Sequence, residues 1–301
     1  MPELSEFIGF VSEKSGIKKS ALIEKEVTIH RMLKELSSKT AGKYVLKGGT
    51  CLIKCYFGYY RFSVDLDFTW KNPEVWRDLG KKRLRRSLLD EIGLLGSLLE
   101  KISEEICLEF KNDHSERRYF EFGGGGRMVT MKLWKGTELI KVQVNFLEDL
   151  LFPVKKVGVM TLLSDAKLSR DEKAYFKGFL EFYSPFEVQA YDEREILCEK
   201  VRAILTRRKQ RLRDFYDVFV LDRNGFNFEE FREEIIKKIR ASLYYKKYRE
   251  NLERNKRSLG LTREVVEDPF ERDLFVVRPP KSFERFLDKF IAFLKDIATE
   301  F

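Results

Sequence analysis

Apolar side chains recur with the spacing of a helix near the beginning of the chain. Between residues 20 and 36 a set of them can share one face, which predicts an amphipathic helix. The members of this set are Leu22, Ile23, Ile29, Leu33 and Leu36. A short apolar run at residues 43–46 then predicts a strand, and helical spacing returns over residues 50–58, where Gly58 can end the helix.

The segment after this second helix alternates between apolar and polar side chains. Asp65 and Asp67 lie two residues apart, with Leu66 between them and Val64 and Phe68 on either side. Because residues two apart on a strand point to the same face, the pattern predicts a strand with one apolar face and both carboxylates on the other. A solvated edge strand would show the same alternation.

A long helix and a series of strands are predicted in the middle of the chain. Pro73 begins a helical pattern that continues to about Glu105. Alternation then predicts antiparallel strands at residues 106–110, 117–122, 127–134 and 139–146. The glycine run 123–126 lies between two of these strands and precedes no helix, which favours a hairpin turn over a phosphate loop.

The pattern changes after Pro153. Residues 154–191 have the pattern of short strands and loops, and from Asp192 onward nearly every segment has helical periodicity. Strands and helices followed by helices alone predict an α/β (α+β) fold with a helical C-terminal domain. We expect one domain over residues 1–155 and a second over residues 156–301.

Two features near residue 50 point to the same chemistry. Gly48, Gly49 and Thr50 form a turn ahead of a helix, and such a turn offers backbone N–H groups and the positive helix end to a phosphate. Asp65 and Asp67 on one strand face suit a divalent metal that substrate phosphates also hold. Together they predict a site for a nucleoside triphosphate with Mg²⁺ or Mn²⁺.

Three segments resemble the AbiEii-type toxin family of the nucleotidyltransferase superfamily. The superfamily's first motif, Gly-Gly/Ser, a helix and then Asp-x-Asp, is matched by K-G-G-T at residues 47–50 and R-F-S-V-D-L-D-F at residues 61–68. I-E-K-E at residues 23–26 is similar to the N-terminal helix entry of the family. Residues 195–218, with E-K-V-R-A-I-L and R-D-F-Y-D-V, are similar to its late motif.

The resemblance implies a fold and a set of roles. The first domain would be a nucleotidyltransferase-like mixed sheet with flanking helices, and the helical C-terminal domain would contribute Lys200 and Asp214 or Asp217. The catalytic residues that it implies are Asp65, Asp67, Lys200, Asp214 and Asp217, of which Asp65 and Asp67 hold the metal. The residues expected to bind the nucleotide are Gly48, Gly49, Thr50, Arg61 and Ser63.

Several of these residues have ordinary structural alternatives. Arg61 could pair with a surface carboxylate, and Lys200 lies among apolar helix positions from which a lysine usually extends to the helix edge. The resemblance instead places a triphosphate-contacting lysine at Lys200. Asp214 and Asp217 share a helix face and could form ion pairs with Arg213, orient the attacking hydroxyl, or brace Lys200.

One strand departs from the superfamily pattern. A third carboxylate usually lies on a later central strand, as the general base for the attacking hydroxyl. The matching strand here has Lys141, Gln143 and Asn145 in phase, and none of them is a carboxylate. Asp214 or Asp217 could substitute, the base could be dispensable, or the chain could be weakly active or inactive.

The composition limits where the protein acts. The 301-residue chain has 43% apolar residues, enough for a sizeable core, and no apolar run of about eighteen residues that would predict a membrane span. Its first residues, M-P-E-L-S-E, lack the order of a signal peptide. Four cysteines without a secreted-domain pattern favour a reducing compartment, so we expect a cytoplasmic protein.

An excess of positive charge suits a polyanionic partner. The chain has 58 basic and 49 acidic residues, a formal net charge of +9. Residues 200–213 contain seven cations and no acid, and residues 237–249 combine six cations with Tyr244, Tyr245 and Tyr248. Cations interleaved with aromatic rings suit phosphates and unpaired bases, so RNA is an expected partner, although a solvated helix face can have the same composition.

The sequence therefore predicts a nucleotidyltransferase that moves a nucleoside monophosphate from an NTP to a hydroxyl. The resemblance implies RNA as acceptor, at the 3′ end of tRNA, and a toxin with a cognate antitoxin protein. The alternative is a catalytically weak or inactive nucleotide- or RNA-binding module, which Gln143 would explain. Transfer to a protein hydroxyl is a third possibility.

Overall fold

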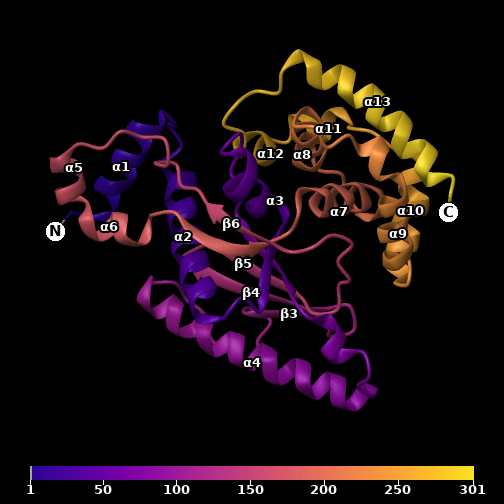
Figure 1. Cartoon of the computed structure of the whole chain (residues 1–301), viewed down its shortest axis with the longest axis horizontal. Helices are drawn as coiled ribbons and strands as arrows, with labels where there is room; N and C mark the ends of the chain where they lie inside the picture. Colours follow the sequence, from indigo (N-terminus) through magenta and orange to yellow (C-terminus); the bar gives the residue numbers. More distant parts are fainter. Residues whose placement is uncertain (1) are drawn as a thin grey trace. The chain divides into compact units, whose positions relative to one another are not determined.

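The structure is a computed structural model in which residues 2–301 are described, and it contains two compact units (Figure 1). The first unit comprises the residues up to Asp149 together with Val154–Ala190. The second comprises Leu150–Pro153 and Tyr191–Phe301. Which of the two carries the catalytic function stays a prediction.

A mixed sheet forms the centre of the first unit. The described residues give seven strands in the order β3-β4-β5-β2-β1-β7-β6. The strands are β1 (Tyr44–Lys47), β2 (Asp65–Trp70), β3 (Phe120–Gly123), β4 (Met128–Lys135), β5 (Glu138–Asn145), β6 (Lys155–Val159) and β7 (Phe186–Ala190). Strand β2 lies between β1, which is antiparallel to it, and β5, which is parallel. The predicted fold class is confirmed.

Helices flank this sheet. They are α1 (Leu4–Ser15), α2 (Ser20–Lys39), α3 (Gly48–Cys51), the π-helix η1 (Leu52–Phe57), the 3-10 helix η2 (Pro73–Trp76), α4 (Lys81–Glu105), α5 (Arg170–Tyr175) and α6 (Lys177–Phe182). Helix α2 packs against β2, and α4 packs against β4 and α2 (Figure 1). Tyr44 of β1 donates a 2.9 Å hydrogen bond to Glu91 of α4 and contacts the Phe68 ring. Helix α4 therefore lies on the apolar face of the sheet, opposite Asp67.

Most predicted elements of the first unit are confirmed. The helix predicted at residues 20–36 is α2, and the strand predicted at residues 139–146 is β5. The glycine run 123–126 joins β3 to β4 as a hairpin turn, in which the Gly126 N–H donates to the Gly123 carbonyl at 2.9 Å. Alternation and turn residues were sufficient signals in this region.

Four predicted segments are wrong in detail. The helix predicted from Pro73 to about Glu105 is divided into η2 (Pro73–Trp76) and α4 (Lys81–Glu105). Residues 106–110 form only a single bridge at Glu109, because the positive φ of 56° at Cys107 interrupts an extended strand there. The region of strands and loops predicted at residues 154–191 also contains α5 and α6. Helix α5 begins with a capping box between Ser169 and Glu172, a signal that was present in the sequence. The helix predicted at residues 50–58 is mostly the π-helix η1.

The second unit is helical apart from its loops. Its helices are α7 (Glu193–Thr206), α8 (Leu212–Arg223), the 3-10 helix η3 (Phe228–Phe231), α9 (Arg232–Ser242), α10 (Lys246–Arg257), α11 (Arg263–Glu267), α12 (Pro269–Asp273) and α13 (Lys281–Ala298). Helix α7 is central and packs against α8, α9, α10 and α13. Buried phenylalanines repeat along α13, where Phe286 and Phe290 contact Phe228, and this helical spacing explains the strong periodicity of the C-terminal sequence.

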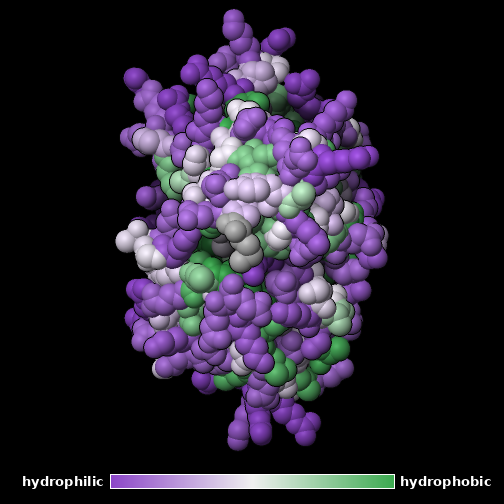
Figure 2. All heavy atoms as spheres, turned by 90° about the vertical axis from the view of Figure 1, so that its left-hand side faces the viewer, coloured by the Kyte–Doolittle hydropathy of each residue, from purple (hydrophilic) through white to green (hydrophobic). Residues whose placement is uncertain are grey.

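The surface reflects the composition. Hydrophilic side chains cover most of the face shown in Figure 2, as a chain with 36% charged residues would predict. Among residues 2–301, no helix combines the length and the apolar character needed to cross a membrane.

Candidate active site

Gly48 and Gly49 form the first turn of α3, directly after β1, and this glycine turn lies close to one of the paired carboxylates. Gly48 has a φ of 71°, which glycine adopts without strain. A Cβ placed on Gly48 would lie only 2.8 Å from Asp67 Oδ2. The absence of a side chain at this position therefore lets the backbone of the turn approach the carboxylate of Asp67.

The second glycine makes room for a buried arginine. A Cβ on Gly49 would lie 2.5 Å from Arg61 Nη2 and 3.2 Å from Ser63 Oγ. Arg61 is 2% exposed, and its Nη1 donates a 2.8 Å hydrogen bond to the Phe62 carbonyl. Its burial contradicts the alternative that Arg61 pairs with a carboxylate on the surface. The structure thus brings Gly49, Arg61 and Ser63 together.

Thr50 ties the start of α3 to the strand that carries the aspartates. Its hydroxyl Oγ1 lies 2.5 Å from the Asp65 carbonyl oxygen and 2.8 Å from Ser63 Oγ. The Thr50 side chain is buried. This hydroxyl therefore links the glycine turn to β2, and any phosphate bound at the turn would meet backbone N–H groups first.

Asp65 and Asp67 project from the same face of β2, and both are half-buried. In the sheet register, Asp67 lies opposite Lys47 of β1 and beside Gln143 of β5. Gln143 thus occupies the strand position next to Asp67, a register that the sequence alone did not give. Its amide is within 3.2 Å of Met128 Sδ, so the neighbour of Asp67 is a neutral, internally bonded group.

Sequence reasoning missed Lys25 as a neighbour of this site. Lys25 Nζ donates a 2.7 Å hydrogen bond to the Leu139 carbonyl. Burial lowers the pKa of the Lys25 ammonium, and the negative charge of Asp65 opposes that shift. Lys25 belongs to the I-E-K-E segment. This segment contributed to the family resemblance, but the resemblance assigned no role to Lys25.

Glu148 is a second residue that the sequence did not reveal. Its Oε2 lies 2.5 Å from Lys47 Nζ and 3.1 Å from both Thr69 Oγ1 and Asn145 Nδ2. Lys47, Thr69 and Asn145 belong to β1, β2 and β5, so Glu148 adds a carboxylate to the polar side of the central strands. It follows the end of β5 in an irregular segment, where strand alternation gives no information.

These residues fit a divalent cation that shares its ligands with a substrate. Within residues 2–301, no group of three or more histidine, cysteine, aspartate or glutamate side chains could hold a metal on its own. Asp65 and Asp67 offer two oxygen-bearing carboxylates on one face. Mg²⁺ is usually bound by one or two carboxylates with water and substrate phosphates, so this donor set suits it.

In the second unit, Lys200 is held by two carboxylates. Its Nζ lies 2.8 Å from Asp214 Oδ1 and 2.6 Å from Asp217 Oδ2, with both aspartates buried. Arg207 also pairs with Asp214. Burial alone would raise the pKa of the Asp214 carboxyl, but Arg207 and Lys200 outweigh it and the pKa is lowered. Arg213 pairs with Glu271 instead, at 3.5 Å.

The two basic blocks are only partly available on the surface. Lys238 is buried and paired with Glu195 at 2.5 Å, which removes it from any exposed patch. Tyr244 is 75% exposed, and the Tyr245 ring contacts the rings of both Tyr244 and Tyr248 edge to face. The exposed cations of the first block, in the loop between α7 and α8, are Arg208, Lys209 and Arg211.

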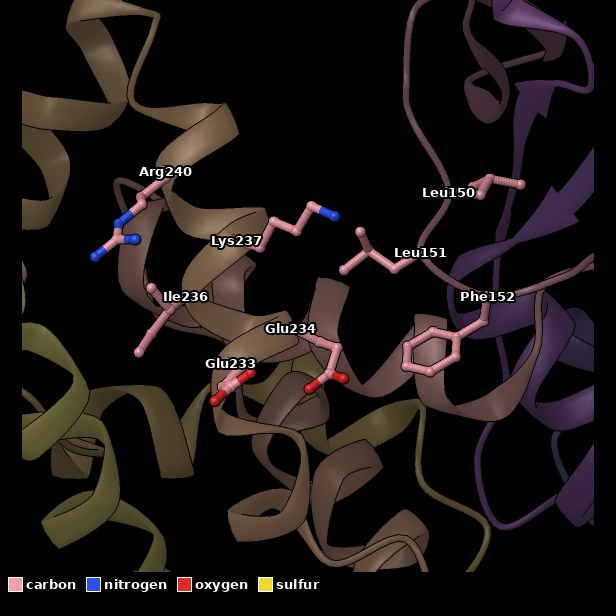
Figure 3. A pocket seen from close by; sticks show the side chains of 8 residues that line it. All are labelled: Leu150, Leu151, Phe152, Glu233, Glu234, Ile236, Lys237 and Arg240. Atoms are coloured by element: carbon pink, nitrogen blue, oxygen red, sulfur yellow. The ribbon is translucent and has the colours of Figure 1, made fainter.

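A cavity of about 720 Å³ lies in the second unit between residues 150–152 and helix α9 (Figure 3). Its lining mixes Leu151 and Phe152 with charged side chains of α9, among them Glu234 and Lys237. None of the predicted site residues lines it, and it has no convergent set of groups suited to the chemistry described above.

Most of the sequence matches a known family. The family model described as "Nucleotidyl transferase AbiEii toxin, Type IV TA system" matches residues 31–300. No curated protein matches the chain significantly.

Proposed function

Because the chain belongs to the AbiEii nucleotidyltransferase toxin family of type IV toxin–antitoxin systems, we propose that it transfers a nucleoside monophosphate from an NTP to a hydroxyl of RNA. The acceptor would be the 3′ end of tRNA. The acceptor oxygen attacks the α-phosphorus, the bond from that phosphorus to the bridging oxygen breaks, and pyrophosphate leaves. The observation that carries the proposal is the contact of the Gly48 turn with Asp67.

Each group of the first unit has a distinct part in this proposal. The N–H groups of the glycine turn bind triphosphate oxygens, and Arg61 beside Gly49 adds positive charge there. Asp65 and Asp67 would hold Mg²⁺ or Mn²⁺. When bound, the cation would neutralise charge on the phosphates.

The proposed role of Lys200 is to bind the triphosphate, and this role rests on the family resemblance. The geometry of the second unit supports it to the extent that Asp214 and Asp217 hold the ammonium in one place. The lowered pKa of Asp214 keeps that carboxylate ionised and paired. This favours a bracing role for Asp214 over that of a general base, whose pKa should lie closer to the working pH.

Glu148 is a further candidate to accept the proton of the attacking hydroxyl. Its carboxylate lies among Lys47, Thr69 and Asn145, just after β5, the strand on which the superfamily usually has its third acid. Glu148→Gln should lower the rate of transfer without weakening NTP binding, because proton removal matters in the transition state. A rate equal to that of the unchanged protein would exclude it.

The central test is incubation of the protein with each labelled NTP, Mg²⁺ and total RNA. Label incorporated into RNA, and lost in Asp65→Asn, supports the transferase. NTP binding without incorporation into RNA supports the competing function, a nucleotide- or RNA-binding module. Gln143, in place of a carboxylate, would explain why such a module is inactive. Label on a protein in a reaction supplied with cell extract would move the acceptor from RNA to a protein hydroxyl.

RNA binding can be tested separately by its salt dependence. Lys246 and Lys247 are exposed, and replacing both by alanine should reduce the salt slope by about 0.7 for each phosphate that is no longer neutralised. Arg249 is left intact because its Nη1 donates to the Leu243 carbonyl at 2.6 Å, at the end of α9. The matched control replaces Lys281 and Arg285, two exposed cations of α13. Equal slopes for the two double variants would remove this block from the RNA interface.

The family also implies a cognate antitoxin. Expression of the chain alone should arrest growth, and Asp65→Asn should relieve the arrest if toxicity depends on transfer. Arrest by Asp65→Asn at equal protein levels would separate toxicity from the proposed chemistry.

A further inference from the structure

A polar cluster is buried in the first unit next to the helical segment that follows Gly48 and Gly49. Glu26 of α2 accepts hydrogen bonds from Lys54 Nζ and from the hydroxyls of Tyr59 and Tyr183. Glu26 and Lys54 are each 3% exposed. No step of the proposed chemistry uses these groups, so their burial needs another explanation.

The partner of Glu26 lies in the π-helix. Lys54 belongs to η1, whose wider turn is closed by a 3.0 Å hydrogen bond from the Gly58 N–H to the Ile53 carbonyl. The Lys54 carbonyl also accepts a 2.7 Å hydrogen bond from the Met160 N–H. π-helical turns are rare and occur frequently at functional sites. In η1 this geometry is stabilised by the two backbone hydrogen bonds just described.

Two anchors fix the segment that begins at Gly48. Thr50 holds its first turn to β2 through the Asp65 carbonyl, and Lys54 holds the next turn to α2 through Glu26. Thr50 and Lys54 are four residues apart. The residues directly after the glycine turn are thus tied to β2 and, one turn further on, to α2.

An ion pair is an unusual choice for this purpose. Burying both charges carries a desolvation penalty that apolar side chains of the same size would avoid. Burial lowers the pKa of Lys54, and the neighbouring charge of Glu26 opposes this shift. The pair provides a defined direction and register that an apolar contact lacks, because its hydrogen bonds require a narrow range of distances and angles.

We propose that Glu26 and Lys54 are positioning residues that hold the Gly48–Gly49 turn against Asp67, so that NTP binding depends on their ion pair. The inference rests on the proposed function of the same site. It assigns to the I-E-K-E segment a physical role, the connection of α2 to the phosphate-binding turn.

The experiment measures NTP affinity by calorimetry, with Mg²⁺, on the full chain at a temperature where circular dichroism shows each variant to be folded. Glu26→Gln and Lys54→Met should each weaken NTP binding by about tenfold to a hundredfold, because a displaced turn no longer matches the phosphates. Backbone amides of residues 48–58 should also exchange hydrogen faster. The matched control is Leu99→Ala, a cavity in α4 that lowers stability without contact to the turn.

The outcomes separate positioning from general stabilisation. Weak binding in Glu26→Gln and Lys54→Met, with Leu99→Ala within about twofold of the unchanged protein, supports the proposal. Binding at full strength in the two variants overturns it, as does an equal loss in Leu99→Ala. If a single variant fails to fold, the double variant Glu26→Gln with Lys54→Met leaves no buried charge unpaired and decides in the same way.

Failure of the proposed function would be recognised independently. If the unchanged protein binds no NTP, that function is wrong. Amide exchange then decides the positioning role: faster exchange at residues 48–58 in Lys54→Met but not in Leu99→Ala supports it, and unchanged exchange overturns it.

Discussion

The two units each contain a pair of aspartates on one face of one element, but the pairs differ in their surroundings. Asp65 and Asp67 on β2 are half-buried and lie beside a glycine turn. Asp214 and Asp217 on α8 are buried, and both bind Lys200. The two pairs of aspartates therefore look similar in the sequence but differ in burial and in ion pairing in the folded units.

The difference shows what decides the role of a carboxylate pair. A half-buried pair beside a glycine turn is accessible to solvent and to an added ligand. A pair that surrounds a buried ammonium already has its cation, and losing one partner would leave a buried charge uncompensated. We therefore expect substitutions in the first pair to affect chemistry and substitutions in the second to affect stability.

The largest expected effect is on transfer activity. Asp65→Asn and Asp67→Asn each remove a negative charge from the proposed metal site with little change in size, so transfer should fall by about a thousandfold or more. The free energy of unfolding should change by less than about 1 kcal/mol. Radiolabel transfer and urea unfolding measure the two effects. Activity near that of the unchanged protein in either variant would end the assignment of this pair to a metal.

The corresponding substitution in the second unit should act on folding. Asp217→Asn leaves the buried Lys200 ammonium with one carboxylate fewer, and breaking a buried pair costs about 3–5 kcal/mol. Urea unfolding monitored by circular dichroism would show the loss. If Asp217→Asn lowers the free energy of unfolding no more than Asp65→Asn does, burial and ion pairing do not give the two aspartate pairs different roles in stability.

A smaller effect should appear in the pH dependence of stability. Burial lowers the pKa of His30 in the first unit well below 6.5, with the positive charge of Lys54 adding to the shift. Because the folded pKa lies below the unfolded one, the stabilising contribution is present above pH 6.5 and is lost as the pH falls below it. Relative to His30→Gln, the unchanged protein should lose about 1.4 kcal/mol of unfolding free energy between pH 7.5 and 5.5.

The second unit provides the contrast for this measurement. The lowered pKa of Asp214 means that its contribution is present above about pH 3.8 and lost below it. The difference between the unchanged protein and Asp214→Asn should therefore be constant between pH 7.5 and 5.5. A sloping difference for Asp214→Asn, or a flat one for His30→Gln, would contradict the assigned shifts.

The comparison also shows how far the sequence could be read. Period-two alternation located β2 and β5, but the register that places Gln143 beside Asp67 is set by the pairing of the two strands in the folded sheet. The identity of the partners could not be read in the same way. The Lys54–Glu26 pair joins residues 28 positions apart, and Glu148 lies in an irregular segment, so neither leaves a periodic signal. Spacing likewise allowed Asp214 to brace Lys200 but could not choose that contact over an ion pair with Arg213.

The smallest expected effect comes from restoring the missing acid. Gln143→Glu places a carboxylate beside Asp67 in the register of β2 and β5, where the superfamily usually has its general base. Like charges on neighbouring strands repel, so the substitution should lower the free energy of unfolding by about 0.2–1 kcal/mol.

If only the base is missing, the same substitution should raise the rate of transfer by about two- to tenfold, with NTP affinity unchanged. The measurement is single-turnover transfer at saturating NTP, with Lys141→Glu as a control that adds a carboxylate on the same strand beside Asp65. An equal rise in both variants would reflect added charge at the metal site and not a base. An unaltered rate in Gln143→Glu would mean that proton removal at this position does not limit the reaction. The accessibility of the carboxylates to a ligand would then be the remaining difference between the pair at Asp67 and the pair at Asp214.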